Sequence, residues 1–102
     1  MSIIVQNSLR KKYGSSTFAV IATIQNKEFI NDPEGETILH DLILKRGYSN
    51  VLSVRTAKTL KFLVNAKTAE QAVKLVEKVC DELRIFNPIV SDCTVEFNRF
   101  EA

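Results

Sequence analysis

The sequence predicts a small α+β domain with the element order β-α-β-β-α-β, a split sheet with two helices on one face. Apolar residues alternate with a period of two in four segments, which is typical of strands. Two further segments carry apolar residues at helical spacing and begin with helix-start signals. In chain order we expect a strand at 17–25, a helix at 33–46, strands at 51–57 and 60–64, a helix at 69–85 and a strand at 94–100.

Length and composition fit one domain with a separate N-terminal segment. The chain has 102 residues, of which 45% are hydrophobic and 25% charged, so it can close one modest core. We expect an N-terminal arm at residues 1–16 and the domain at 17–102, because residues 14–16, Gly-Ser-Ser, have a linker composition. The net charge of +2 comes from interleaved cations and acids, which argues against a nucleic-acid or membrane surface.

Compartment signals favour a cytoplasmic protein. No apolar run reaches the ~20 residues of a membrane helix, and the first residues lack the basic leader of a signal peptide. Cys80 and Cys93 are too few for a disulfide framework. We expect both to be buried or half-buried free thiols.

The first helix begins with residues that suit a helix start. The Asp32 side chain can accept hydrogen bonds from the free amides of the first turn, and Pro33 suits the first helical position. Gly35 lies in that turn, where we expect a side chain to be sterically unwelcome. Gly47 follows the last turn and is expected to end the helix in the left-handed conformation.

The segment between the helices carries the candidate interface residues. Its two alternating halves meet at residues 57–59, which predicts either a hairpin with a short, glycine-free loop or one long strand with a kink. Arg55 and Lys58 flank this point. Two cations at this spacing can contact an anion or a carboxylate of a partner, or they can be plain solvated charges.

The second helix and the sheet complete the expected domain. Thr68 and Gln71 form a capping box that opens the helix, and Pro88 ends it by disfavouring helical geometry at the preceding residue. Ala19 and Ile21 point to the sheet face that the helices leave open. We therefore expect a second copy or another subunit to complete or cover the sheet.

The sequence names no catalytic, cofactor-binding or metal-binding residue. Three scattered glycines make no phosphate loop, and no Cys or His spacing matches a zinc site. The one histidine, His40, follows Glu36 by four residues on the outer face of the first helix and is expected to be solvated. Asp32 fits a helix cap better than a general base. We therefore predict a protein that binds and organises partner proteins.

An ordered set of residues resembles the PurS family, the small third subunit of phosphoribosylformylglycinamidine (FGAM) synthase in bacteria and archaea. The set comprises Asp32-Pro33-Glu34-Gly35, Gly47, Val51, Val54-Arg55, Lys58, Ala72, Cys80, Leu83 and Asn87-Pro88-Ile89-Val90. The similarity covers about residues 17–101. The chain departs from the family at Ala57, where glycine is usual, and at residues 91–93, where an acidic-aromatic run is usual.

The resemblance implies a non-catalytic structural subunit of a ligase. In this family the holoenzyme uses ATP, Mg²⁺ and glutamine to convert formylglycinamide ribonucleotide into the formylglycinamidine in purine (IMP) biosynthesis. The small subunit is a dimer or tetramer that bridges a PurL-type synthetase and a PurQ-type glutaminase and assists ammonia transfer. It binds no cofactor itself. Arg55 and Lys58 match the family as interface candidates, whereas Asp32, Pro33 and Gly35 shape the helix start.

Two other protein classes share this order of strands and helices. A small ligand-sensing regulatory module would bind an effector, such as an amino acid or a nucleotide, between subunits. An acyl-phosphate hydrolase would need an anion-binding loop with an arginine and a nearby asparagine that positions water. The turn after the first strand has Asn26 and Asn31 but no arginine, which disfavours the hydrolase.

Overall fold

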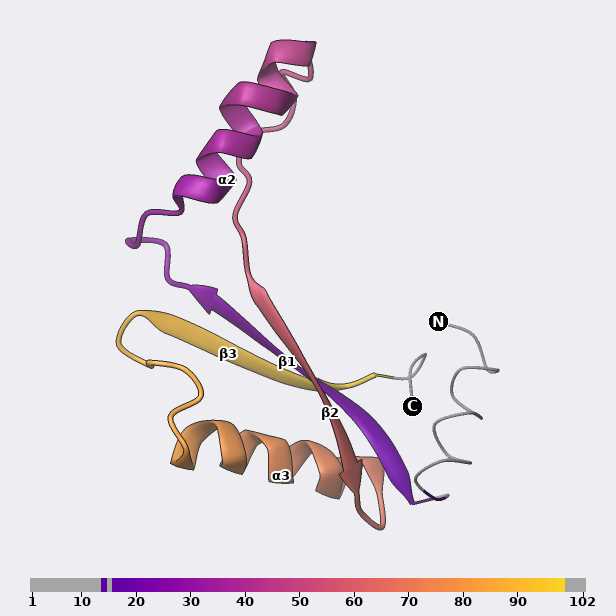
Figure 1. Ribbon diagram of the computed structural model, residues 1–102. Coiled ribbons are helices and arrows are strands. Elements are labelled where there is room, and N and C mark those ends of the chain that lie inside the picture. Colours follow the sequence, from indigo (N-terminus) through magenta and orange to yellow (C-terminus); the bar gives the residue numbers. More distant parts are fainter. Residues whose placement is uncertain (1–13, 15, 99–102) are drawn as a thin grey trace.

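The structure, a computed structural model, is a three-stranded antiparallel sheet with one helix packed on it and a second helical segment that projects away (Figure 1). It describes residues 14 and 16–98. The sheet order is β2-β1-β3. The elements are β1 (Thr17–Asn26), α2 (Pro33–Thr37), η1 (Ile38–Ile43), η2 (Leu44–Arg46), β2 (Lys58–Asn65), α3 (Ala69–Glu82) and β3 (Ser91–Phe97).

The core lies between β1 and α3. Strand β1 is central and pairs antiparallel with both neighbours, and its even-numbered residues Val20 and Ala22 are buried against Val76 and Cys80 of α3. The predicted cap of this helix is confirmed, because the backbone amide of Gln71 donates to the Thr68 hydroxyl at 3.1 Å. We call β1, β2, β3 and α3 the body.

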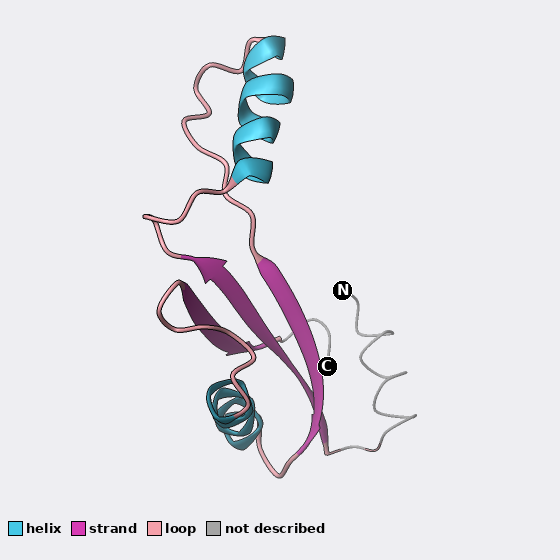
Figure 2. Cartoon of the chain, turned by 60° about the vertical axis from the view of Figure 1, so that its left-hand side comes forward, coloured by secondary structure: helices cyan, strands magenta, loops and turns pink. Residues whose placement is uncertain are grey.

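Residues 27–57 form a separate part, which we call the helical extension. Its rod is continuous from α2 through η1, which is π-helical, to η2, a single 3₁₀ turn. Gly47 ends the rod with φ of 90°, as predicted. The chain then returns along the rod and runs into β2. The rod packs against no strand of the sheet and not against α3, and Figure 2 shows it pointing away from the body.

The α+β class is confirmed, but two details of the predicted arrangement are wrong within the described chain. Residues 51–57 pair with no strand, so neither the hairpin nor one long strand forms; the unpaired segment runs on into β2, which begins at Lys58. A tight hairpin needs residues that adopt positive φ, and residues 57–59 are Ala, Lys and Thr. Because the chain does not turn back there, the first helix does not reach the sheet, and α3 alone covers its helix face.

Some predicted boundaries shift, and others lie outside the description. Helix α3 ends at Glu82, before the expected residue 85, because Arg84 turns the chain with a φ of 54°. Strand β3 begins at Ser91, earlier than expected. The predicted N-terminal arm at 1–16 lies outside the described residues except for residues 14 and 16.

Candidate functional site

At the base of the helical extension, Asp32 connects the rod to the segment that returns from its far end. One carboxylate oxygen, Oδ1, accepts a hydrogen bond from the Gly35 amide at 3.1 Å, which confirms the predicted helix cap. The Thr56 hydroxyl donates to both carboxylate oxygens at 2.9 Å, and the Thr56 backbone amide donates to Oδ2. The pKa of Asp32 is lowered, first by the Thr56 amide and then by the Gly35 amide, because these donors stabilise the carboxylate.

Gly35 allows the returning chain to approach the rod. It is buried in the first turn, and a Cβ at this position would collide with the carbonyl oxygen of Val54 and lie 3.1 Å from Asp32 Oδ2. The expectation that a side chain is unwelcome here is therefore confirmed. The close approach keeps the returning segment within hydrogen-bond reach of Asp32. Asp32 and Gly35 therefore together determine how the returning segment packs against the rod.

Arg55 closes the loop that leaves β1. Its guanidinium donates hydrogen bonds to the backbone carbonyls of Ile30 at 2.9 Å, Asn26 at 3.2 Å and Lys27 at 3.0 Å. Sequence reasoning singled out this residue as an interface candidate and missed this role, because carbonyl partners 25 to 29 residues away leave no local signal. The guanidinium thus ties the returning chain of the extension to the end of β1.

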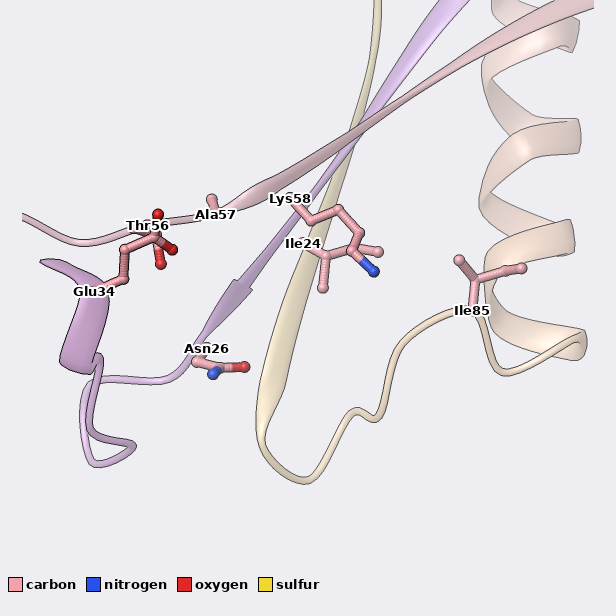
Figure 3. Close-up of a pocket in the computed structure, with 7 residues that line it drawn as sticks. All are labelled: Ile24, Asn26, Glu34, Thr56, Ala57, Lys58 and Ile85. Atoms are coloured by element: carbon pink, nitrogen blue, oxygen red, sulfur yellow. The ribbon is translucent and has the colours of Figure 1, made fainter.

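Lys58 lines a cavity on the helix side of the sheet. The cavity has a volume of about 390 Å³ and is lined by Ile24, Asn26, Glu34, Thr56, Ala57, Lys58 and Ile85 (Figure 3). Ile24 belongs to the same face of β1 as the core residues, and Ile85 follows the end of α3. The cavity therefore marks the part of the sheet face that α3 leaves uncovered. Arg55 and Lys58 have separate surroundings: the first is held by carbonyls, and the second points into this open space.

The extension leaves apolar side chains and backbone groups without partners. Leu42 on the rod is 60% exposed, and Leu52 on the returning chain is 87% exposed. In the body, Leu83 just after α3 and Ile89 just before β3 are exposed as well. Within the described chain, the backbone amides of residues 52–54 donate no hydrogen bond. An extended segment with free amides and apolar side chains is suited to pairing with another strand.

The remaining candidates for reaction chemistry are His40 and any group of side chains that could hold a metal ion. His40 is exposed, with Nε2 3.0 Å from Glu36 Oε2, in agreement with the prediction of a solvated side chain. The described residues contain no cluster of three or more His, Cys, Asp or Glu side chains that could hold a metal ion. No helix in the described part is long and apolar enough to cross a membrane.

Comparison with known proteins gives consistent matches. The model of the family described as "PurS: Phosphoribosylformylglycinamidine (FGAM) synthase" matches residues 19–99. The phosphoribosylformylglycinamidine synthase subunit PurS of Thermotoga maritima is 33% identical over 78 residues, which are 76% of this chain and 93% of that protein.

Solved structures agree with the sequence matches. A chain in the structure of PurLQS from Thermotoga maritima has a TM-score of 0.68 and 32% identity, covering 80% of this chain and 98% of that one. PurS of Methanocaldococcus jannaschii, described as one of the subunits of formylglycinamide ribonucleotide amidotransferase in the purine biosynthetic pathway, has a TM-score of 0.64. It is 25% identical, and the match covers 82% of this chain and 99% of that one.

Proposed function

The chain belongs to the PurS family of FGAM synthase subunits, and from this premise we propose that it bridges a PurL-type synthetase and a PurQ-type glutaminase without catalysing either reaction. As a PurS subunit it acts in purine biosynthesis. In this proposal ATP and Mg²⁺ bind to the synthetase, this chain binds no cofactor of its own, and the assembly is cytoplasmic. The ligand-sensing and hydrolase alternatives have no support from the family match.

The observation that carries the proposal is the helical extension, which leaves its own body and has no core. Strand β2 is an edge strand, since it pairs only with β1 within the described sheet. Residues 51–57 of the same chain cannot reach that edge, because they continue straight into β2. The same residues of a second copy can reach it, and the free amides of 52–54 would then find partners.

We infer a dimer in which two copies exchange their extensions. Residues 51–57 of each copy would pair antiparallel with β2 of the other. Even-numbered residues would face even-numbered residues, because Leu52 and Val54 must share a face with Leu60 and Phe62. The rod of each copy, with Leu42 on its exposed side, would cover the open sheet face of the other near Ile24. Each unit would then regain the predicted four strands with two helices on one face.

Such a dimer suits a bridge because its two bodies are joined by paired strands. A subunit that holds two enzymes side by side raises the effective concentration of the transferred intermediate and supplies no reacting group. In the exchanged dimer, Lys58 lies where the two chains cross, near its symmetry-related copy. We propose that this pair of ammonium groups binds a carboxylate of a neighbouring subunit, while Arg55 holds the base of the extension in shape.

The exchange is tested by giving the chain a turn that it lacks. Ala57→Asn with Lys58→Gly supplies the Asn-Gly sequence of a type I′ turn, so we expect a monomer in sedimentation equilibrium where the wild-type chain is a dimer or tetramer. Ser49→Asn with Asn50→Gly places the same dipeptide at the tip of the extension and should leave the mass unchanged. A wild-type monomer at micromolar concentration would refute the exchange and leave family membership intact.

The bridging role is tested with the reconstituted complex. Lys58→Glu reverses the charge at the crossing point, so we expect at least about tenfold weaker glutamine-dependent FGAM formation with ammonia-dependent formation unchanged. The control is Lys67→Glu, an exposed lysine in the turn before α3, which should have little effect. Equal activity of both variants would remove Lys58 from the interface. Failure of the tagged wild-type chain to retain either enzyme would contradict the bridge itself.

A further inference from the structure

Cys80 and Cys93 lie against each other between α3 and β3. Cys80 is 1% exposed and belongs to the core, and the half-buried Cys93 packs against that core. Cys93 is opposite Ile24 of β1, which places its side chain on the face of the sheet that α3 covers. Both cysteines are free.

A small cavity gives access to this thiol pair. Its volume is about 190 Å³, and its lining residues are Glu77, Cys80, Asp81, Phe86, Cys93 and Val95. A space of this size admits a molecule of a few atoms, and both cysteines contribute to its wall. Buried thiols without access are inert, so the cavity distinguishes this pair from two cysteines that merely fill the core.

We propose that Cys80 and Cys93 form a reversible disulfide that locks α3 to β3 when a small, neutral peroxide enters the cavity. The Cys93 thiolate attacks one peroxide oxygen; a sulfur–oxygen bond forms, the oxygen–oxygen bond breaks, and the leaving oxygen takes up protons and departs as water. The Cys80 sulfur then attacks the Cys93 sulfur, and the sulfenic oxygen leaves as a second water. Two thiols lose two electrons, and the peroxide is reduced to two waters.

The surroundings of the pair determine which oxidant can act and how fast. Burial raises the pKa of Cys93, and Cys80 and Glu77 raise it further, so the thiolate is scarce near neutral pH and the reaction is slow. Glu77 and Asp81 are the charged groups that line the cavity, whereas the neighbours from β1 and the following loop, Ile24 and Phe86, do not ionise. Two carboxylates repel anionic oxidants such as glutathione disulfide. A neutral peroxide is therefore the favoured reagent, and a dithiol reductant reverses the bond by exchange.

The wild-type chain provides the first test. After exposure to hydrogen peroxide and then iodoacetamide, we expect an intact mass that has lost two hydrogen atoms and gained no alkyl group. Peptide mapping should link Cys80 to Cys93, and dithiothreitol should restore both thiols. The rate should rise about tenfold per pH unit around neutrality, because it follows the thiolate fraction. A disulfide between two chains, or overoxidised Cys93 with Cys80 still free, would overturn the proposal.

Variants separate the roles of the two sulfur atoms. Cys80→Ala should let the Cys93 sulfenic acid accumulate, where dimedone traps it, and Cys93→Ser should abolish peroxide reactivity. Glu77→Gln should accelerate the reaction several-fold, since it removes a negative charge beside Cys93. If Cys80→Ala fails to fold, amide exchange on the wild-type chain decides instead: exchange in α3 and β3 should slow on oxidation, and unchanged exchange would contradict the lock.

Discussion

The body and the helical extension are stabilised in different ways. The body has its own core, in which Val20, Val76 and Cys80 are fully buried. The extension buries Gly35 and Leu39 and is otherwise held at its base by hydrogen bonds. One chain therefore contains a part with its own core and a part whose apolar side chains Leu42 and Leu52 stay exposed within the chain. The difference predicts that substitutions in the two parts will have separable effects.

The largest effect is expected in the core of the body. Val76→Asp buries a carboxylate among apolar side chains, so we expect the free energy of unfolding to fall by more than about 4 kcal/mol. The control is Leu75→Asp, one residue earlier on α3, where the side chain is 46% exposed and the expected loss is below about 1 kcal/mol. Urea denaturation followed by circular dichroism measures both. Similar losses would mean that the body's core does not dominate stability.

An intermediate effect is expected at the base of the extension. Gly35→Ala puts a methyl group against the Val54 carbonyl, so we expect a local cost of about 1–3 kcal/mol. Dimerisation should weaken while the urea transition of the body stays near its wild-type midpoint. The control is Gly47→Asn, because Gly47 has open space around its Cβ position and asparagine tolerates positive φ. Equal dimer affinity for wild type and Gly35→Ala would show that this close approach does not support association.

The smallest effect is expected from the titration of Asp32. Its pKa is lowered in the folded chain by the Thr56 and Gly35 amides. Its contribution to stability is therefore complete above the unfolded pKa of about 3.9 and is lost as pH falls through the folded value. The protection factor of the amides at the base of the extension, which divides out the pH dependence of the intrinsic exchange rate, should be steady between pH 7 and 5 and should fall below about pH 4.

Asp32→Asn provides the reference for that titration. It keeps an oxygen for the Gly35 amide and loses the acceptor for the Thr56 amide, so the protection factors should be lower at every pH and should lack the acid-dependent loss. Because other carboxylates titrate in both proteins, the difference between the two curves isolates Asp32. Parallel curves would mean that the carboxylate charge has no role at this junction.

Local chemistry allowed much of this fold to be predicted from sequence. The Asp32 cap, the left-handed end at Gly47 and the Thr68 cap all depend on atoms within a few residues of one another. Such signals can be read from a single sequence because each one depends only on residues that are neighbours in the chain. The order of strands and helices followed from the same kind of evidence.

The placement of the first helix and the roles at the junction could not be predicted in this way. Residues 57–59 lack the glycine or asparagine of a tight turn, but where the straight chain places the first helix depends on contacts outside the segment. The carbonyls that hold Arg55 and the Thr56 groups that bind Asp32 come from chain 24 to 29 residues distant. Sequence reasoning therefore selected Arg55 as a candidate for a partner contact and did not find the carbonyls that its guanidinium binds.

The uninterrupted run from the returning chain into β2 also has a mechanical consequence. Strand β2 is held by β1 along a register that extends from Asn65 opposite Thr17 to Lys58 opposite Ile24. Strands β1 and β2 both enter the extension from the same end of this ladder, so a pull on the extension acts along the two strands together and does not peel them apart. The straight junction therefore makes the chain a stiff tether between whatever is fixed at its two ends.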